Sequence, residues 1–421
     1  MNALITPKKL TGCIAAIPSK SHAHRVLIAQ KLAHLSGQIM ANSLEIPTFS
    51  VDIGATKNCL AQLDKKMPYL DCKESGSTLR FMLPVAMALK NEAVFIGSGK
   101  LPDRPISPLK EEMEAHGCHF TMIDKHQKVS DKYKEICTVK GRLQPGQYSL
   151  PGNISSQFIT GLLFALPLLD GDSTLELTTK LESAGYVDMT LDVLKKFGII
   201  INESKTDECL IKYEIPGNQK YTEPAVLSIE GDWSNACFWL ACGALGGDVT
   251  ITGLDLKSTQ RDKEIVDILV EMGANIIISR NGDIRSCGGN LVGTDVSVNQ
   301  IPDMVPVLAI IMSAAKGASM ITNAERLKIK ESDRLQTVFE LLNNLGGDIT
   351  NGGTSLSITG KATLAGGEVH SHNDHRIAMA AAVASCICKQ SVMIRDAHAV
   401  TKSYPDFFKD FAALGGEVKE M

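Results

Sequence analysis

Amphipathic stretches that end in a glycine and lead into a short β-rich run recur along the chain. Each stretch carries apolar residues at helical spacing, which predicts a helix packed on a core. Glycine suits the end of a helix because the residue there often adopts a left-handed backbone conformation. The five glycines of this pattern are Gly117, Gly198, Gly273, Gly346 and Gly415. Their spacings of 81, 75, 73 and 69 residues predict a repeated helix–strand unit.

A second kind of helix-to-strand junction lies between these glycines, for example in LPLLDGDSTLEL and CGALGGDVTIT. Each unit therefore holds two helices and several strands, and 421 residues accommodate six units. This period exceeds the roughly 20–50 residues of solenoid repeats, so two domains of three units each fit better. The stretch 214–224 is the least periodic, and we expect the domain boundary just after it.

The composition, 44% apolar and 21% charged, is typical of a soluble protein with a hydrophobic core. No apolar run is long enough to span a bilayer, and the N-terminus lacks the features of a signal peptide. Eleven scattered cysteines without a C-x-x-C pair indicate reduced thiols and a cytoplasmic protein. The net charge of −4 argues against nucleic-acid or membrane partners and, taken alone, against an acidic substrate.

Arginines recur in the first turns of predicted helices, where a cation opposes the helix dipole and costs stability unless an anion binds. Four of the eleven arginines, Arg25, Arg80, Arg334 and Arg376, have such positions. Any one of the serines beside these arginines can be explained as an ordinary helix cap. Serine caps beside several cations are also what a phosphate or carboxylate site needs, so the pattern predicts binding of small polyanions.

Two carboxylates among these cations are candidates for acid–base chemistry. Asp303 precedes an otherwise apolar helix, and Glu331 stands between Lys330 and Arg334. Neighbouring charges can tune the proton affinity of such a pair for general acid–base catalysis. The structural alternatives are that Asp303 caps its helix and that Glu331 forms a salt bridge.

Metal and nucleotide chemistry lack their usual signatures. His370, His372 and His375 form an H-x-H-x-x-H run, but this spacing differs from the i, i+4 spacing of HExxH zinc sites. The chain has no phosphate-binding G-x-x-x-x-G-K-[ST] loop, no strand-linked G-x-G-x-x-G and no G-x-S-x-G. We therefore expect no metal and no cofactor.

Seven motifs follow one another between residues 18 and 408: PSKSHAHR, SGSTLR, DRPISPL, GNISSQF, KIKESDR, NDHRIAMA and TKSYPDFF. This series resembles the 5-enolpyruvylshikimate-3-phosphate synthases over essentially the whole chain. The resemblance implies an α/β (α+β) class and a two-domain enolpyruvyl transferase fold, with three βαβαββ repeats and internal helices in each domain. It also implies an N-terminal domain of 18–227, a C-terminal domain of 1–17 plus 228–421, and an active site in the cleft between them.

The same resemblance implies an enzyme that transfers the enolpyruvyl group of phosphoenolpyruvate to the 5-hydroxyl of shikimate 3-phosphate. Phosphate leaves after a tetrahedral intermediate, and the product feeds chorismate and aromatic amino acid biosynthesis. The expected partners are these two small molecules, with no nucleic acid or membrane, and the expected state is a cytoplasmic monomer.

Roles follow from the positions that match the family's motifs. The implied catalytic residues are Lys20, Asp303, Glu331 and His375, where Asp303 takes the hydroxyl proton and Glu331 protonates the phosphoenolpyruvate methylene. The implied ligands of shikimate 3-phosphate are Lys20, Ser21, Arg25, Ser155, Ser156, Gln157, Ser183, Tyr186, Asp303 and Lys330. The implied ligands of phosphoenolpyruvate are Lys20, Gly76, Arg104, Gln157, Arg334, Arg376 and Lys402.

Three positions depart from the family's pattern. Glu74 and Arg326 stand where asparagines are common, and Ala184–Gly185 stands where Lys-Pro can occur. An acid facing phosphoenolpyruvate would be repulsive unless paired or protonated. These departures affect the expected affinity and leave the acid–base residues unchanged.

Three other functions fit the sequence less well. A UDP-N-acetylglucosamine enolpyruvyl transferase carries a reactive cysteine in the loop that corresponds to 97–105, and this loop has none. An RNA 3′-terminal phosphate cyclase needs a nucleotide and an RNA surface, which the acidic balance disfavours. A non-catalytic α/β repeat scaffold would not explain arginines at so many helix starts.

Overall fold

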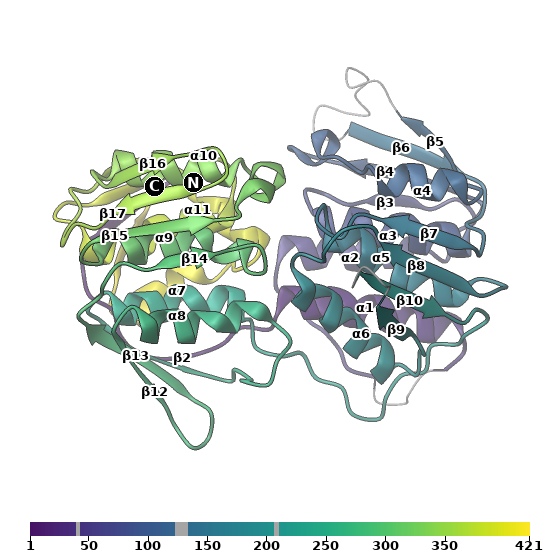
Figure 1. The fold of residues 1–421 in the computed structure, drawn as a ribbon, viewed down its shortest axis with the longest axis horizontal. Helices are drawn as coiled ribbons and strands as arrows, with labels where there is room; N and C mark the ends of the chain where they lie inside the picture. Colours follow the sequence, from purple (N-terminus) through teal and green to yellow (C-terminus); the bar gives the residue numbers. More distant parts are fainter. Residues whose placement is uncertain (39–42, 123–133, 206–209) are drawn as a thin grey trace. The chain divides into compact units, whose positions relative to one another are not determined.

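The chain folds into two compact units, seen in a computed structural model that describes residues 1–38, 43–122, 134–205 and 210–421 (Figure 1). Unit 1 comprises Met1–Ser19 and Glu230–Met421, and unit 2 comprises Lys20–Ile229. The chain passes from one unit to the other after Ser19 and after Ile229, in each case two residues later than the expected domain boundary. Each unit has a hydrophobic core of its own.

Five four-stranded sheets lie in the described residues, and all five have the same topology. The first two strands in spatial order are parallel, and the third and fourth are each antiparallel to the strand before. Unit 2 has β3 (Tyr69–Asp71), β4 (Glu92–Gly97), β6 (Lys134–Lys140) and β5 (His119–Met122) in one sheet, and β7 (Gln147–Leu150), β8 (Ser173–Leu177), β10 (Ile211–Ile215) and β9 (Asn202–Lys205) in another.

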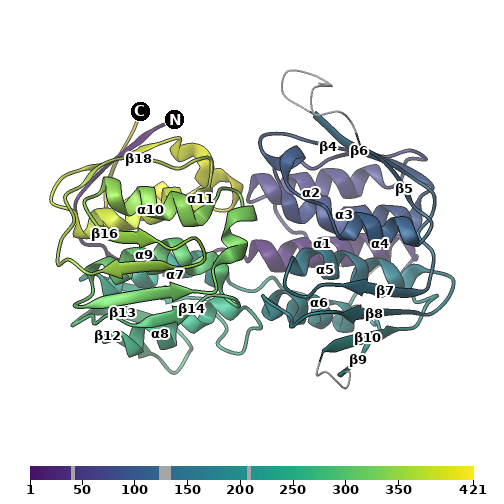
Figure 2. The ribbon, with the colours of Figure 1, turned by 45° about the horizontal axis from the view of Figure 1, so that its top comes forward.

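The three sheets of unit 1 repeat this order. They are β2 (Thr11–Ala15), β11 (Asp248–Thr252), β13 (Ile284–Gly289) and β12 (Ala274–Ile278); β14 (Asp295–Ser297), β15 (Ala318–Thr322), β17 (Leu356–Thr359) and β16 (Asp348–Asn351); and β18 (Gly367–His370), β19 (Val392–Arg395), β1 (Ala3–Thr6) and β20 (Glu417–Glu420). The N-terminal segment thus completes two sheets of unit 1, and Asn2 and Met421 exchange backbone hydrogen bonds of 2.8 and 2.9 Å where the termini meet (Figure 2).

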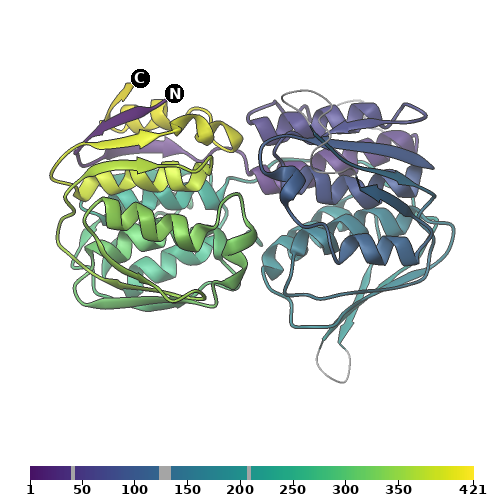
Figure 3. The same cartoon turned by 90° about the horizontal axis from the view of Figure 1, so that it is seen from above.

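Two helices alternate with the strands of each of these five repeats, as the predicted βαβαββ order requires. The first helix of each repeat is buried along nearly its whole length, and the second is buried along one face. The first helices are α3 (Gly76–Leu89), α5 (Ser156–Ala165), α7 (Trp233–Ala244), α9 (Val305–Ala314) and α11 (His375–Ala384); the second are α4 (Leu109–Ala115), α6 (Ala184–Lys196), α8 (Ile265–Glu271), α10 (Arg334–Asn344) and α12 (Phe407–Ala413). In each unit the helices lie inside and the strands outside (Figure 3), which confirms the predicted fold class.

The five glycines that organise the sequence pattern end the second helices. Their φ angles lie between +78° and +91°, a region that only glycine enters without strain. Each is followed by a strand of its repeat, namely β5, β9, β12, β16 and β20. This prediction from the sequence pattern is confirmed.

The first of the six predicted units differs from the other five. It supplies α1 (Lys20–Leu35) and α2 (Val51–Gln62), but none of the described residues between them is assigned to a strand. Pro47 lies in this stretch and cannot donate to a strand ladder. Side chains hold the segment instead, since Gln30 Nε2 donates to Leu44 O at 3.0 Å and to Glu223 Oε1 at 2.8 Å.

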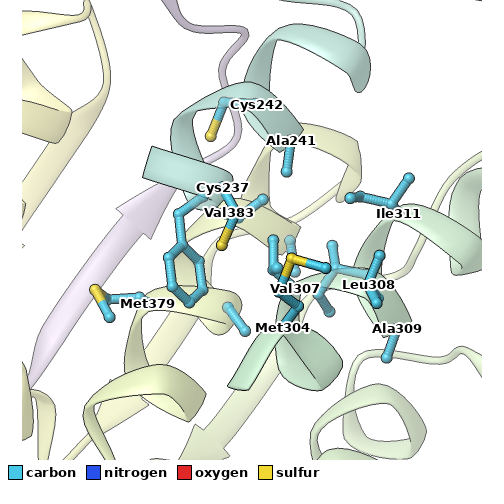
Figure 4. Close-up of a cluster of buried hydrophobic side chains, with 14 of the residues drawn as sticks. Cys237, Ala241, Cys242, Met304, Val307, Leu308, Ala309, Ile311, Met379 and Val383 are labelled. Carbon is cyan, nitrogen blue, oxygen red and sulfur yellow. The ribbon is translucent and has the colours of Figure 1, made fainter. Parts of the chain in front are cut away.

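Helices α7, α9 and α11 form the centre of unit 1. Cys237 and Ala241 of α7, Val307 of α9 and Val383 of α11 gather in a cluster of buried hydrophobic side chains, to which Met379 of α11 also belongs (Figure 4). All of these side chains are buried, so the three helices pack on one another through apolar side chains. No helix in the described parts of the chain has the length and hydropathy to cross a membrane.

Candidate active site

Arg334, the first residue of α10, joins three carboxylates in unit 1. Its Nη1 lies 2.7 Å from Asp303 Oδ1, its Nη2 lies 2.7 Å from Glu331 Oε2, and its Nε lies 2.8 Å from Asp374 Oδ2. The side chain is 1% exposed. Burial lowers the pKa of Arg334, but the three carboxylates outweigh that effect and raise it well above its ordinary value. The first-turn arginine is thus compensated by the protein's own anions.

Asp303 lies in the 3-10 turn η4 (Pro302–Met304), directly before α9, and faces further cations. Lys330 Nζ lies 3.4 Å from its Oδ1, and Arg376 Nη2 lies 3.5 Å from its Oδ2. Met304 is the residue that caps α9, and no side-chain cap bond is made there, so the alternative that Asp303 is an N-cap is wrong. Burial lowers the pKa of Lys330, and Asp303 opposes this shift.

The remaining predicted residues of unit 1 gather around the start of α11. Asp374 caps this helix by accepting from Arg376 N at 3.0 Å, and its Oδ1 lies 3.8 Å from His375 Nδ1. Lys402, at the end of the 3-10 turn η7 (Ala397–Lys402), donates to Asn373 O at 2.6 Å. All predicted site residues of unit 1 therefore lie at the starts of α9, α10 and α11 or bind residues there.

The three histidines do not come together as a metal site. His372 binds Glu340 at 3.0 Å, and its ring centroid lies 4.9 Å from that of His370. His375 is buried in the first turn of α11. Within the described ranges, no group of three or more metal-ligating side chains is found.

In unit 2, Arg25 is a buried cation surrounded by neutral acceptors. It donates to Ser21 O at 2.6 Å, to Tyr186 O at 2.8 Å and to Thr190 Oγ1 at 2.8 Å. Burial lowers its pKa to about 9. No acidic side chain among the described residues forms an ion pair with it, so its charge is available to an anionic ligand that reaches α1 and α6.

Gln157 connects the starts of α3 and α5. Its Oε1 accepts from Arg80 Nη1 at 2.6 Å, and its Nε2 donates to Ser77 Oγ at 2.9 Å. Ser155 caps α5 by accepting from Gln157 N at 3.3 Å, and Ser156 follows as the first helical residue. Ser155 and Ser156, two of the predicted ligands of shikimate 3-phosphate, thus stand beside the backbone N–H groups of a helix start.

Gly76 and Arg104 are in direct contact. A Cβ on residue 76 would lie 2.6 Å from Arg104 Nη1, so only glycine leaves room for the guanidinium. Arg104 Nε is buried without a hydrogen-bond partner in the described residues. The carboxyl group of Glu74 lies against Gly99, which is five residues before Arg104. A Cβ on residue 99 would be 2.5 Å from that carboxyl group.

The other predicted residues of unit 2 also lie at helix starts. Lys20 begins α1 and pairs with Asp52 of α2 at 2.8 Å, and Ser21 follows it. Ser183 precedes α6 with a left-handed φ of 55°, and its carbonyl accepts from Tyr186 N at 3.1 Å. Strained positions of this kind concentrate at functional sites.

The whole chain also matches a known family. The model for "EPSP synthase (3-phosphoshikimate 1-carboxyvinyltransferase)" matches residues 4–411. The chain belongs to the EPSP synthase family. The relatives named 3-phosphoshikimate 1-carboxyvinyltransferase include one from Clostridium kluyveri, 43% identical over 430 residues with 99% of this chain and 98% of the relative covered. Another, from Clostridium perfringens strain 13, is 41% identical over 437 residues, with 99% of both chains covered.

Solved structures have the same fold. The EPSP synthase of Acinetobacter baumannii has a TM-score of 0.74 at 24% identity and covers both chains completely. The enolpyruvyl transferase NikO of Streptomyces tendae has a TM-score of 0.71 at 15% identity, with 100% of this chain and 98% of that one covered. The resemblance stated from the motifs is confirmed, and the alternative transferase is not favoured.

The sequence missed two acids of this EPSP synthase family member. Asp374 is the cap of α11 and also binds Arg334. Asp52 stands in the first turn of α2, an ordinary place for an acid, so its pairing with Lys20 had no signal in the sequence. Both contacts span more than 30 positions.

Proposed function

We propose that this EPSP synthase family member transfers the enolpyruvyl group of phosphoenolpyruvate to the 5-hydroxyl of shikimate 3-phosphate and releases phosphate. Family membership supports the reaction. The observation that carries the assignment of residues is the buried Arg334, which holds Asp303 and Glu331 on one guanidinium. Two carboxylates fixed among cations are what paired proton transfer requires.

Asp303 accepts the proton of the 5-hydroxyl while the hydroxyl oxygen forms a bond to C2 of phosphoenolpyruvate. Glu331 donates a proton to C3, which becomes a methyl group, and a tetrahedral intermediate results. The bond from C2 to the phosphate oxygen then breaks, Glu331 takes back a proton from the methyl group, and the double bond returns. Lys330 binds the 5-hydroxyl beside Asp303, and its pKa, lowered by burial, suits a group that donates to that oxygen.

The cations stabilise the charge that develops on the departing phosphate, a large term in sites of this type. Arg104, Arg376 and Lys402 bind phosphoenolpyruvate, with Gly76 giving Arg104 its place. Arg334 was assigned to the same anion, but three carboxylates already occupy it, so we propose that its main task is to fix Asp303 and Glu331.

Shikimate 3-phosphate is held by Ser155 and Ser156 at the start of α5 and by Arg25, whose charge has no acidic partner in the described residues. The other proposed ligands of this substrate are Ser21, Ser183, Gln157 and Tyr186. The proposed catalytic residues also include Lys20 and His375. The shikimate 3-phosphate residues named here and the catalytic Lys20 lie in unit 2, whereas Asp303, Glu331 and His375 lie in unit 1. We propose that all of them act on the same pair of substrates.

We further propose a monomer that works in the cytoplasm. One chain supplies both sets of residues, so a partner subunit is not needed to complete them. The ten described cysteines are free thiols, which favours a reducing compartment.

Phosphate release tests the reaction. The purified chain with phosphoenolpyruvate should release phosphate when shikimate 3-phosphate is added and not when UDP-N-acetylglucosamine is added. Phosphate release with UDP-N-acetylglucosamine but not with shikimate 3-phosphate would overturn the proposal. The Asp303→Asn chain, which keeps the anion-binding residues, is the matched control for contaminating phosphatase.

A further inference from the structure

A buried carboxylate that the proposed function does not use lies beside the unit 1 cluster. Asp262, in the 3-10 turn η3 (Arg261–Glu264), is 4% exposed and accepts a hydrogen bond from Ser234 Oγ in the first turn of α7. The carbonyl of Ser234 in turn accepts from Arg376 Nη1 at 3.3 Å. Arg376 also binds Asp303 through its carbonyl at 3.3 Å and its carboxylate at 3.5 Å. Asp262 is therefore connected to Asp303 through one serine and one arginine.

The groups that face Asp262 come from every element around it. Asp232, the N-cap of α7, and Asp303 of η4 are the acids, Arg376 of α11 is the cation, and Cys237 is the thiol. Burial, and then the charge of Asp303, raises the pKa of Asp262 to about 6, while Arg376 and the Ser234 hydrogen bond oppose that shift. Burial and the Asp262 charge also raise the pKa of Cys237.

Apolar side chains lie close to the groups that contact Asp262. One turn beyond Ser234 stands Cys237, and one turn beyond Arg376 stands Met379, both labelled in the apolar cluster of Figure 4. Met304, adjacent to Asp303, belongs to the same cluster. Buried charges beside apolar side chains interact more strongly than charges in water, so Asp262 and Asp303 affect each other's proton affinity.

This influence matters because Asp303 has three cationic neighbours, Arg334, Lys330 and Arg376, at 2.7, 3.4 and 3.5 Å. Opposite charges at such distances favour the ionised carboxylate and weaken it as a base. A second negative charge has the opposite effect and restores proton affinity.

We propose that Asp262 is a positioning residue that orients Ser234 and Arg376 and whose negative charge strengthens Asp303 as a base. This inference rests on the proposed function, in which Asp303 takes the hydroxyl proton. When Asp262 is ionised, Asp303 removes that proton more readily. When Asp262 binds a proton at low pH, Asp303 becomes a weaker base and turnover falls.

Two substitutions shift this dependence in opposite directions. Asp262→Asn removes the titrating group, so we expect kcat at neutral pH to fall 10- to 100-fold and the acid limb of the kcat profile to move to lower pH. Ser234→Ala removes a hydrogen bond that favours the ionised form, so the acid limb should move to higher pH. Asp267→Asn, an exposed acid on the neighbouring α8, loses the same charge and should leave the profile unchanged.

The experiment measures kcat against pH for the wild type and these three variants, with saturating shikimate 3-phosphate and phosphoenolpyruvate. Circular dichroism of each variant confirms that it is folded, and Ser234→Ala suffices if Asp262→Asn does not fold. Acid limbs that coincide in all folded variants would overturn the inference while the proposed function stands. A wild type without turnover would overturn both.

Discussion

Arg334 Nη1 lies 2.7 Å from Asp303 Oδ1, although 31 positions separate the two residues. The contact joins the start of α10 to the turn before α9, and both side chains are largely withdrawn from solvent, at 1% and 16% exposure. The same guanidinium binds Glu331 and Asp374. One buried cation therefore sets the positions of the proposed base, the proposed acid and the cap of α11.

Removing this cation should destabilise unit 1. Arg334→Met leaves Asp374, which is 0% exposed, without its charge partner, and breaking a buried ion pair in this way costs about 3–5 kcal/mol. Trp233 and Trp239, the two tryptophans of the chain, both lie on α7, so urea unfolding followed by their fluorescence reports on unit 1.

Arg285→Met is the matched control, because it breaks an exposed arginine–aspartate pair in the same unit. Such pairs contribute little, and the unfolding midpoint should stay near that of the wild type. Equal midpoints for the two variants would show that the Arg334 cluster does not stabilise the unit.

Neutralising either proposed proton-transfer group should lower turnover without loss of binding. Asp303→Asn and Glu331→Gln remove the proton acceptor and donor, and general acid–base groups contribute about 10²–10⁴-fold in rate. We expect kcat to fall by that range while calorimetric binding of shikimate 3-phosphate changes little. Glu325→Gln, an exposed acid in the nearby turn η5 (Glu325–Ile329), should behave as wild type. Normal turnover in either variant would remove that residue from the mechanism.

A methyl group at residue 76 should weaken phosphoenolpyruvate binding. Gly76→Ala places a Cβ 2.6 Å from Arg104 Nη1, so the guanidinium must move. We expect the KM for phosphoenolpyruvate to rise at least about tenfold, the effect of losing about 1.4 kcal/mol of binding, with a smaller change in the KM for shikimate 3-phosphate. Gly288→Ala is the control, since its Cβ would meet nothing closer than 3.5 Å. An unchanged KM in Gly76→Ala would show that Arg104 does not bind this substrate.

The ionisation of Asp262 should also make the free energy of unfolding depend on pH. Its pKa is raised to about 6 in the folded protein, above the ordinary value of 3.8 expected in the unfolded chain. Between these two values the folded protein retains a proton that the unfolded chain has lost, so this group makes stability fall as pH rises. The free energy of unfolding of Asp262→Asn, relative to wild type, should therefore increase by up to about 3 kcal/mol from pH 4 to pH 7. A difference that does not vary with pH, as expected for Asp267→Asn, would contradict the shift.

Local patterns in the sequence were sufficient to predict two domains of repeated helix–strand units, and the family resemblance supplied the βαβαββ order. The stop glycines Gly117, Gly198, Gly273, Gly346 and Gly415 mark helix ends through backbone geometry, which a single position determines. The first repeat could not be predicted in the same way, because side-chain bonds from Gln30 and Glu223 hold its backbone, and such partners lie far apart in the sequence.

The sequence predicted which residues lie at the helix starts, but it did not predict which carboxylate pairs with which arginine. The arginines predicted in first turns indicated a need for anions, and the pattern could not tell a substrate from the protein's own carboxylates. Arg25 and Arg80 are in fact the sixth and fifth residues of their helices. In the structure Arg334 and Arg376 bind Asp303, whereas Arg25 and Arg80 bind neutral acceptors. Which carboxylate reaches which arginine depends on how α9, α10 and α11 pack, and no local pattern contains that information.

Mass spectrometry of the product formed in D2O tests the central claim most directly. Phosphoenolpyruvate and shikimate 3-phosphate should give a product in which an enolpyruvyl group has replaced a hydrogen of shikimate 3-phosphate. Part of that product should carry deuterium in the methylene, because C3 is protonated to a methyl group and then deprotonated. The absence of this product would contradict the proposed reaction, and a product free of deuterium would contradict protonation at C3.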